Sequence, residues 1–470
     1  MRNSGHALLW LSSSAISLSA GPAVAAEITD IADAADTVTI GELEKDDPFD
    51  FYFNSNFTMI LQNGKITREA MNRPGVQNAN CANAASSRDC LPVDELRYSR
   101  ATNIFDFGGE AGLFHDLSLT FGFHYVMSDL QKLRFAKDVS EDTSTIDPAT
   151  GTALFPVRDG YQAKHVGFGP VDLGLKLGPL SDERDDSKPA WVVYVNWANP
   201  WMSKRFEAAT RATPSTPGPV GDGVHRITFG TAFSKRVGNF GLIGIDPEVN
   251  RRGFLDPYMD FNYTLPVPQR GRADAANITA ESFGKRPAHQ AHFAAGAEIV
   301  GLEDLKNGRR VAIDLGLCSA FISEGRNPTM AFGPPGYGGC TGQGHQFSQL
   351  VDALGELTYT EQYFHVGGIL GIYIQAAEFI RFKAGLGLGY DTEHFLTYED
   401  PGTDNNQDGL IQDPTTDTKN PKDAYNPYYC GHDANDHCPA GTPSYDAPGF
   451  RFKAEEAVTF NWFATLMFTF

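Results

Sequence analysis

The last stretch of the chain alternates between apolar and polar positions almost without interruption. Every second residue from Val458 to Phe470 is apolar, and most of these are aromatic, whereas most residues between them are small or polar. A period of two residues is typical of a β-strand, because successive side chains of a strand point to opposite faces. The pattern therefore predicts a terminal strand with one wholly apolar face.

The same pattern recurs along the chain and predicts about twelve strands. In each, one face is apolar and rich in aromatic residues, and the other face carries the polar groups. A soluble β-sandwich has polar outward faces, so the pattern favours an all-β fold, a transmembrane antiparallel up-and-down β-barrel. The predicted strands are 50–62, 98–113, 117–125, 164–177, 190–201, 224–237, 240–245, 290–300, 310–322, 363–374, 379–398 and 450–470, and segment 258–267 with a partner would raise the count to fourteen.

Short and long connections alternate between these predicted strands. In outer-membrane barrels the short turns lie on the periplasmic side and the long loops on the extracellular side. An even number of strands then puts both ends of the barrel domain on the periplasmic side. Within segment 164–177 the apolar positions change parity at Gly169-Pro170, which predicts a β-bulge there.

The beginning of the chain has the pattern of an export signal. Arg2 is followed by an apolar stretch over 7–18 and by Ala23-Val24-Ala25, which fits the small-x-small cleavage pattern. We therefore expect a signal peptide over 1–26 and a barrel over 49–470. The acidic segment 27–48 has no clear strand pattern, and either a disordered periplasmic tail or a plug in the barrel mouth fits it.

Charge and cysteine content narrow the setting further. The formal net charge of −20 argues against nucleic acid as a partner. An export signal combined with a barrel pattern predicts the outer membrane of a Gram-negative bacterium, with its lipid and lipopolysaccharide as partners. An even number of cysteines in an exported chain favours disulfides, and the expected pairs are Cys81–Cys90, Cys318–Cys340 and Cys430–Cys438.

The polar faces of the strands predict what lines the barrel lumen. Charged groups away from water are normally paired, because an unpaired one is costly. A network of ion pairs that fills a narrow lumen is one interpretation. A permeation path in which Arg381 and Lys383 attract carboxylates is the other. The residues expected along such a path are Asp172, Lys176, Arg226, His292, Glu298, Asp314, His365, Arg381 and Lys383.

Two polar stretches near the C-terminus have the spacing of metal ligands. The first matches the first half of a calcium loop, in which oxygen atoms at alternate positions converge on one ion. Thr415 stands where such a loop has its bidentate glutamate, so an acidic loop without calcium fits equally well. In the second, His432 and His437 beside the last cysteine pair would suit zinc, but outside the cell a disulfide is favoured. No cofactor is required, and the calcium positions are Asp404, Asn406, Asp408, Leu410 and Asp413.

Two strand segments resemble a known family. Segments 110–125 (EAGLFHDLSLTFGFHY) and 166–180 (VGFGPVDLGLKLGPL) are similar to outer-membrane transporters of the phenol-degradation meta-pathway type, which are grouped with the fatty-acid and aromatic-hydrocarbon channels. The run 172–176 matches the second half of that family's pattern, whereas Asn199-Pro200-Trp201 departs from its usual rim. The resemblance implies passive uptake of small, often hydrophobic molecules, without catalytic residues.

The terminal strand, which ends in Phe470, also resembles the last strand of bacterial outer-membrane barrels. In those proteins the barrel-assembly machinery reads this strand, so the machinery is an expected partner. Two hypotheses follow for the function. One is a channel for passive uptake of small hydrophobic or aromatic solutes, and the other is a structural or surface-interaction barrel with a filled lumen and functional loops. The sequence shows no nucleophile motif of a hydrolase, so an enzyme is not expected.

Overall fold

The computed structural model describes a large part of the chain between Phe51 and Thr469. The described residues are 51–68, 93–114, 116–137, 139, 161–180, 187–202, 214–218, 220, 224–237, 251–268, 286–304, 308–328, 357–377, 379–397, 402–403, 418, 420–422, 424–425 and 452–469. The predicted signal peptide and segment 27–48 lie outside them. Within the described residues, no helix has both the length and the apolar character to cross a membrane.

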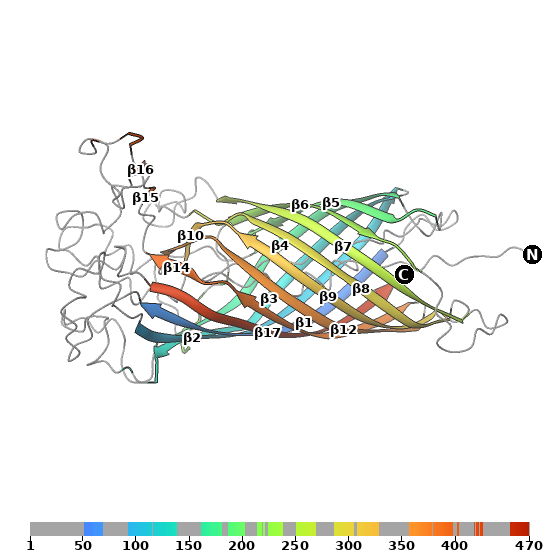
Figure 1. The fold of residues 1–470 in the computed structure, drawn as a ribbon. Coiled ribbons are helices and arrows are strands. Elements are labelled where there is room, and N and C mark those ends of the chain that lie inside the picture. The colour runs from blue at the N-terminus through green and yellow to red at the C-terminus, as the bar shows by residue number, and fades with distance from the viewer. Residues whose placement is uncertain are drawn as a thin grey trace, which may run out of the picture.

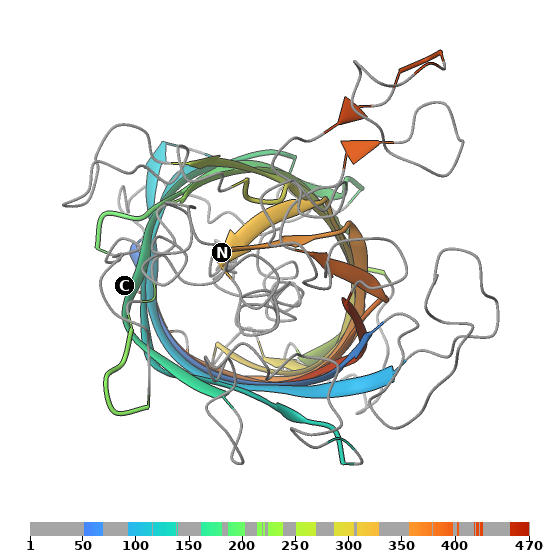
Figure 2. The same ribbon diagram turned by 90° about the vertical axis from the view of Figure 1, so that its left-hand side faces the viewer.

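Twelve antiparallel strands form a closed barrel, which confirms the predicted fold class (Figures 1 and 2). Each strand pairs with its neighbours in chain order, and the first and last strands pair to close the ring. The wall strands are β1 (Phe51–Arg68), β2 (Val93–Phe114), β3 (Leu117–Phe135), β4 (Tyr161–Leu180), β5 (Ala190–Asn199), β6 (Val224–Ser234), β7 (Arg251–Pro268), β8 (Gln290–Asp304), β9 (Arg309–Ile322), β12 (Tyr363–Ala377), β13 (Ile380–Asp391) and β17 (Phe452–Thr469).

The two ends of the barrel differ in their connections. Tyr52 of β1 pairs with Thr469 of β17, so both ends of the barrel domain lie at one rim, as predicted. We call this the turn rim, because it also carries the short connections such as 115–116 and 378–379. The opposite end, which we call the loop rim, carries the long connections. There, β10 (Gly325–Pro328), β11 (Leu357–Thr360) and β14 (His394–Thr397) extend the sheet beyond β17.

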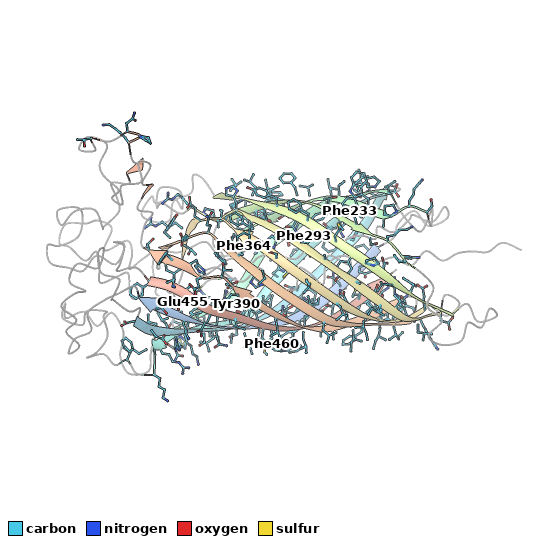
Figure 3. The ribbon with its side chains drawn as sticks, in the orientation of Figure 1. Phe233, Phe293, Phe364, Tyr390, Glu455 and Phe460 are labelled. Carbon is cyan, nitrogen blue, oxygen red and sulfur yellow. The ribbon has the colours of Figure 1, made fainter. Side chains whose placement is uncertain are left out.

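The outer face of the barrel is apolar along its length. Large hydrophobic side chains are exposed on every wall strand except β5, where they are half-buried, and the labelled Phe233, Phe293, Phe364 and Tyr390 lie on the outside of the wall (Figure 3). On β17 the face that begins at Val458 is exposed or half-buried, whereas Thr459, Asn461 and the other odd positions are buried. The predicted parity of the terminal strand is therefore confirmed, and the lipid-facing side is the aromatic one.

One predicted strand was wrong. The partner of β6 is β7, which covers 251–268, and not segment 240–245. Segment 240–245 lies outside the described residues, and the edges of β6 are already occupied by β5 and β7. Pro257 and Pro266 lie within β7 and weakened its strand signal. The predicted number of twelve wall strands is confirmed, and the alternative of fourteen is wrong.

The strand register shifts at several places in the wall, and two of these shifts bear on the predicted parity. Between β3 and β4 the register shifts where Phe123 faces Val171 and Tyr125 faces Phe168, so the predicted bulge at Gly169-Pro170 is confirmed. On β17 the inward parity changes between Phe452 and Thr459, and Glu456 between them has a positive φ of 48°. A bulged residue lets a strand keep its apolar face outward when the sequence changes parity.

Candidate functional site: the barrel lumen

The nine residues predicted to line a path are all buried on wall strands. They alternate with exposed or half-buried neighbours, most of them apolar, so their side chains point inward. They come from five strands on one side of the ring and from β4, and they do not gather at one level. Their positions are Asp172 and Lys176 on β4, Arg226 on β6, His292 and Glu298 on β8, Asp314 on β9, His365 on β12, and Arg381 and Lys383 on β13.

A chain of hydrogen bonds crosses the inner wall from β17 to β4. Thr465 donates to Asn56 Oδ1 at 3.0 Å, and Asn56 Nδ2 donates to Asp106 at 3.2 Å. His124 then lies between two carboxylates, with Nδ1 2.6 Å from Asp106 and Nε2 3.0 Å from Asp172. Carboxylates only accept, so both contacts are hydrogen bonds when the ring is an imidazolium.

Most inward cations on β2, β4 and β13 have acidic partners. Arg100 contacts Asp129 at 2.7 Å, and Lys176 contacts Glu110 at 3.2 Å. Lys383 lies 3.8 Å from Asp314, which also accepts a hydrogen bond of 2.7 Å from Tyr258. The neighbouring Arg381 lies over the ring of Tyr52, 5.6 Å from its centroid. Arg381 and Lys383 therefore do not form an isolated pair of cations.

A cluster of aromatic residues and arginines narrows the inner wall near the turn rim. Tyr52, Phe254, Tyr373 and Met467 belong to one buried apolar cluster that runs from β7 round to β1. The guanidinium of Arg310 lies 5.1 Å from the centroid of Phe254 and pairs with Glu298 and, at 3.6 Å, with Glu303. Such contacts fix long side chains across the wall. We call this set the turn-rim cluster.

Among the described residues, buried carboxylate side chains outnumber buried lysine and arginine side chains. The inner wall is therefore acidic overall, like the whole chain. An anion that entered would meet cations that are already partnered and carboxylates that repel it. The predicted attraction of Arg381 and Lys383 for carboxylates remains a prediction, but the surrounding wall opposes it.

Between the charged regions lies a section of wall without charge. On β13, Gly387 pairs with Ile369 of β12 and with Asn461 of β17, while Gly389 pairs with Gly367 and Thr459. These inward positions are buried, except that Gly367 is half-buried. We call Gly367, Ile369, Gly387, Gly389, Thr459 and Asn461 the neutral section.

Several polar atoms of the neutral section lack a protein partner. Neither amide atom of Asn461 has a hydrogen-bond partner in the described part of the chain, and the same holds for the hydroxyl of Thr459. Buried polar groups are nearly always satisfied, by protein or by a guest such as water. The neutral section thus offers donors and acceptors to whatever occupies the lumen beside it.

On the β1–β4 side, the inner wall nearer the loop rim carries two apolar clusters with the Arg100–Asp129 pair between them. Ile60, Ile104 and Val126 pack with Val220, which comes from the connection between β5 and β6. That connection is held to β4 by two backbone hydrogen bonds of Gly218, 2.8 and 3.1 Å long. Further out, Ile66, Leu96, Tyr98, Leu133, Ala163, Leu396 and Phe452 form a second buried apolar cluster.

The β12–β13 side of the loop rim is polar by contrast. His365 donates from Nδ1 to Asp391 at 2.6 Å, and Gln62 donates to the same carboxylate at 3.3 Å. His394 of β14 stacks on Tyr363 with ring centroids 4.3 Å apart, and burial lowers its pKa, which favours the neutral ring. The inner wall near the loop rim therefore combines apolar clusters on the β1–β4 side with a polar network on the β12–β13 side.

Sequence reasoning missed several partners within this network. Glu110, Asp129, Glu303, Arg310 and Asp391 hold the predicted residues in place, and Asn461 marks the neutral section. Parity along their strands was the available signal for each of them. Which of them meet across strands depends on register, which one sequence does not specify.

The predicted metal and disulfide residues cannot be placed in the same way. The calcium positions 404–413 and Cys81, Cys90, Cys340, Cys430 and Cys438 lie outside the described residues. Cys318 is half-buried on β9 and faces inward. Its Sγ would lie 3.2 Å from the Cβ of any larger residue in the place of Gly367. Its predicted pairing with Cys340 stays a prediction.

Comparison with known proteins gives structural neighbours only. No family model matches the chain, and no curated protein matches it. An outer-membrane channel of Pseudomonas putida F1 has 10% identity and a TM-score of 0.32 over 88% of this chain and 95% of its own. The outer-membrane protease OmpT of Escherichia coli has 6% identity and a TM-score of 0.27 over 92% and 100%, respectively. A FadL homologue of Pseudomonas aeruginosa has 9% identity and a TM-score of 0.29 over 93% and 92%. At these identities and TM-scores the similarities carry no argument about function.

Proposed function

We propose that this chain is an outer-membrane channel that lets small, uncharged hydrophobic or aromatic solutes pass by diffusion. The observation that carries the proposal is the neutral section, where Gly387 of β13 pairs with Asn461, whose amide has no protein partner in the described part of the chain, and Gly389 pairs with Gly367 of β12. Gly387 and Gly389 add no side chain to the lumen at this level. Unpartnered donors and acceptors can bind and release a weakly polar solute without breaking an ion pair.

The outer location is part of the proposal. In the described part of the chain, closure gives every wall strand a paired neighbour on both sides, and the outward face of the barrel is apolar, which suits a lipid environment. The export-signal pattern at the start of the chain and the alternation of short and long connections support the outer membrane as that environment.

The chemistry of the wall supports neutral solutes over ions. The apolar clusters near the loop rim offer a surface to a hydrophobic molecule before it reaches the neutral section. The inner cations are engaged by carboxylates or aromatic rings, and the acidic excess repels anions. We propose passive transport rather than catalysis, because the polar side chains of the wall are arranged as partners of each other.

The proposal can be tested with purified barrel in liposomes. Asn461→Phe places a ring in the neutral section and should reduce the uptake of a labelled uncharged aromatic solute at least several-fold. Asn461→Ala should leave uptake unchanged or raise it. Trp462→Phe is the matched control, because the adjacent side chain faces lipid and should not affect uptake. Equal uptake by Asn461→Phe and wild type would refute the assignment of the path.

A filled structural barrel is the second candidate function. The turn-rim cluster and the hydrogen-bonded chain from Thr465 to Asp172 are the observations that favour it, because the cluster joins strands from β7 round to β1 and the chain links the neighbouring strands from β17 to β4. Wild-type barrel that folds fully in liposomes but transports no uncharged solute of any size would favour this candidate.

A further inference from the structure

A group of cations lies on the outer face of the barrel at the loop rim. Lys132 and Arg134 are exposed on β3, and they alternate with the buried Gln131 and Leu133, so they point outward. By the same alternation Lys164 on β4, Arg97 on β2 and Lys65 on β1 point outward. We call these five residues the rim cations.

The strand register brings the rim cations together. Arg97 pairs directly with Lys65 on one side and with Arg134 on the other, so three cations form a row across β1, β2 and β3. Lys132 pairs with Gln162, two residues from Lys164, which makes the two lysines diagonal neighbours. Like charges at directly opposite positions destabilise a sheet unless something offsets them.

Acidic side chains offset only part of this group. Asp94 binds Arg97 with two contacts of 2.5 and 2.6 Å, and Glu456 pairs with Lys65. In the described part of the chain, Lys132, Arg134 and Lys164 have no carboxylate within ion-pair distance. In a protein with a net charge of −20, three adjacent cations without acidic partners favour an external anion.

The rim cations lie directly beyond the apolar belt. On β3 the outward series Phe123, Tyr125 and Leu130 precedes Lys132, and the ring of Tyr125 packs against that of Phe168 at 5.0 Å. At the corresponding rim of the other wall, Phe364 and Tyr390 occupy outward positions (Figure 3). Acyl chains would lie on the apolar side of this boundary and headgroups on the cationic side.

We propose that Lys132, Arg134 and Lys164, with Arg97, bind the phosphate groups of lipopolysaccharide in the outer leaflet. A phosphorylated glycolipid fits three features of the site at once: anionic groups for the cations, sugar hydroxyls for Gln162 and Ser99, and acyl chains for Tyr125 and Phe168. Arginine suits this role because its planar fork binds phosphate in two places. The inference rests on the proposed outer-membrane location but not on transport.

The test measures lipopolysaccharide retained by the folded barrel. Wild-type barrel refolded in bilayers with lipopolysaccharide should keep bound glycolipid through detergent extraction, as counted by native mass spectrometry. The double variant Lys132→Glu/Arg134→Glu should retain at least roughly 25-fold less, since each of the two basic residues near an anionic lipid surface contributes on the order of fivefold. Lys132→Gln/Arg134→Gln should give a smaller loss, and it serves if charge reversal prevents folding.

Controls separate this site from general charge effects and from the channel. Lys188→Glu, an exposed change in the turn-rim connection between β4 and β5, should not alter retention. Wild-type barrel should retain dephosphorylated lipid A and phosphatidylglycerol poorly. Equal retention by wild type and Lys132→Glu/Arg134→Glu, or equal retention of dephosphorylated lipid A, would overturn the proposal. Solute uptake by the double variant should match wild type whichever way retention turns out, so a failed channel proposal remains distinguishable.

Discussion

At the scale of single residues, the inner wall depends on charges that share their partners. His124 is the clearest case, because it lies between Asp106 and Asp172 on two different neighbouring strands. Asp172 is fully buried, so the imidazole is the group that keeps its carboxylate from being isolated. Removing one member of such a buried network lowers the free energy of unfolding by more than the intact network contributes to it, because an unpaired buried charge is left behind.

We therefore predict that His124→Ala destabilises the barrel by about 3–5 kcal/mol. Adding Asp172→Asn to this variant should restore part of the loss, because the amide carries no charge. Denaturant titration of the folded barrel in liposomes, arranged as a double-mutant cycle, measures the coupling. A cost below about 1 kcal/mol for the single change would show that the network is not structural.

Residues of the outer face should respond to depth in the membrane. Leu370 lies at the centre of β12, and its outward partners Leu315 and Leu386 are exposed. Leu370→Arg should cost roughly 2–4 kcal/mol, because a cation near the midplane is far from water. The control Val366→Arg is on the same face of the same strand but nearer the loop rim, and it should cost less. Similar costs for both in a lipid folding assay would contradict the assigned depth.

At the scale of elements, β17 shows how a strand combines two parities. Glu456 adopts φ of 48°, a conformation that costs most side chains roughly 1–2 kcal/mol but costs glycine little. The exposed ion pair between Glu456 and Lys65 stabilises the fold by at most about 1 kcal/mol. The conformational cost of the positive φ at Glu456 is therefore larger than the stabilisation that the ion pair with Lys65 contributes.

Glu456→Gly should accordingly leave the free energy of unfolding unchanged or raise it by about 1 kcal/mol. The neighbouring Glu455 has no positive φ, and it accepts a hydrogen bond of 3.0 Å from Thr67. Glu455→Gly should thus be destabilising. Chemical unfolding of both variants in the same lipid checks the pair, and a reversed order would rule out strain at Glu456.

The same scale shows what sequence could predict. Alternation located eleven of the wall strands because one face meets lipid and the other meets the lumen. It failed at β7, whose inward Asp256 and Asp260 and internal prolines look unlike a strand until a polar lumen is known to accept them. The apolar segment 240–245 was predicted as a strand instead, because hydrophobic periodicity alone does not identify the secondary structure of a short apolar segment.

The candidate site was predictable only in part, and for a related reason. Parity gave the inward direction of Asp314 and Lys383, but their approach to 3.8 Å follows from the register of β9, β12 and β13. Likewise, the neutral section exists because glycines on β13 meet Asn461 across a seam between segments far apart in sequence. Which side chains face each other across neighbouring strands depends on the stagger of the strands around the whole barrel.

At the scale of the whole molecule, the barrel is asymmetric around its circumference. Strands β1 to β4 are long, whereas β5 and β6 are short. The long strands carry the hydrogen-bonded chain on their inner face and the rim cations on their outer face. The β12–β13 side contributes the glycines and the polar entrance. Transport and lipid binding are therefore proposed for different sectors of one wall, which is why variants can separate them.

The pairing of β1 with β17 also determines how the barrel can assemble. Every other neighbouring pair in the wall joins consecutive wall strands, but this pair joins the two ends of the domain. Until it forms, the sheet has two open edges whose backbone groups lipid cannot satisfy. We therefore expect closure to be the committing step of assembly, and we expect a chain cut short at either end to stay an open, aggregation-prone sheet. Phe57 and Trp462, whose rings lie 5.0 Å apart across this seam, meet only at that moment, so the fluorescence of Trp462 would time it.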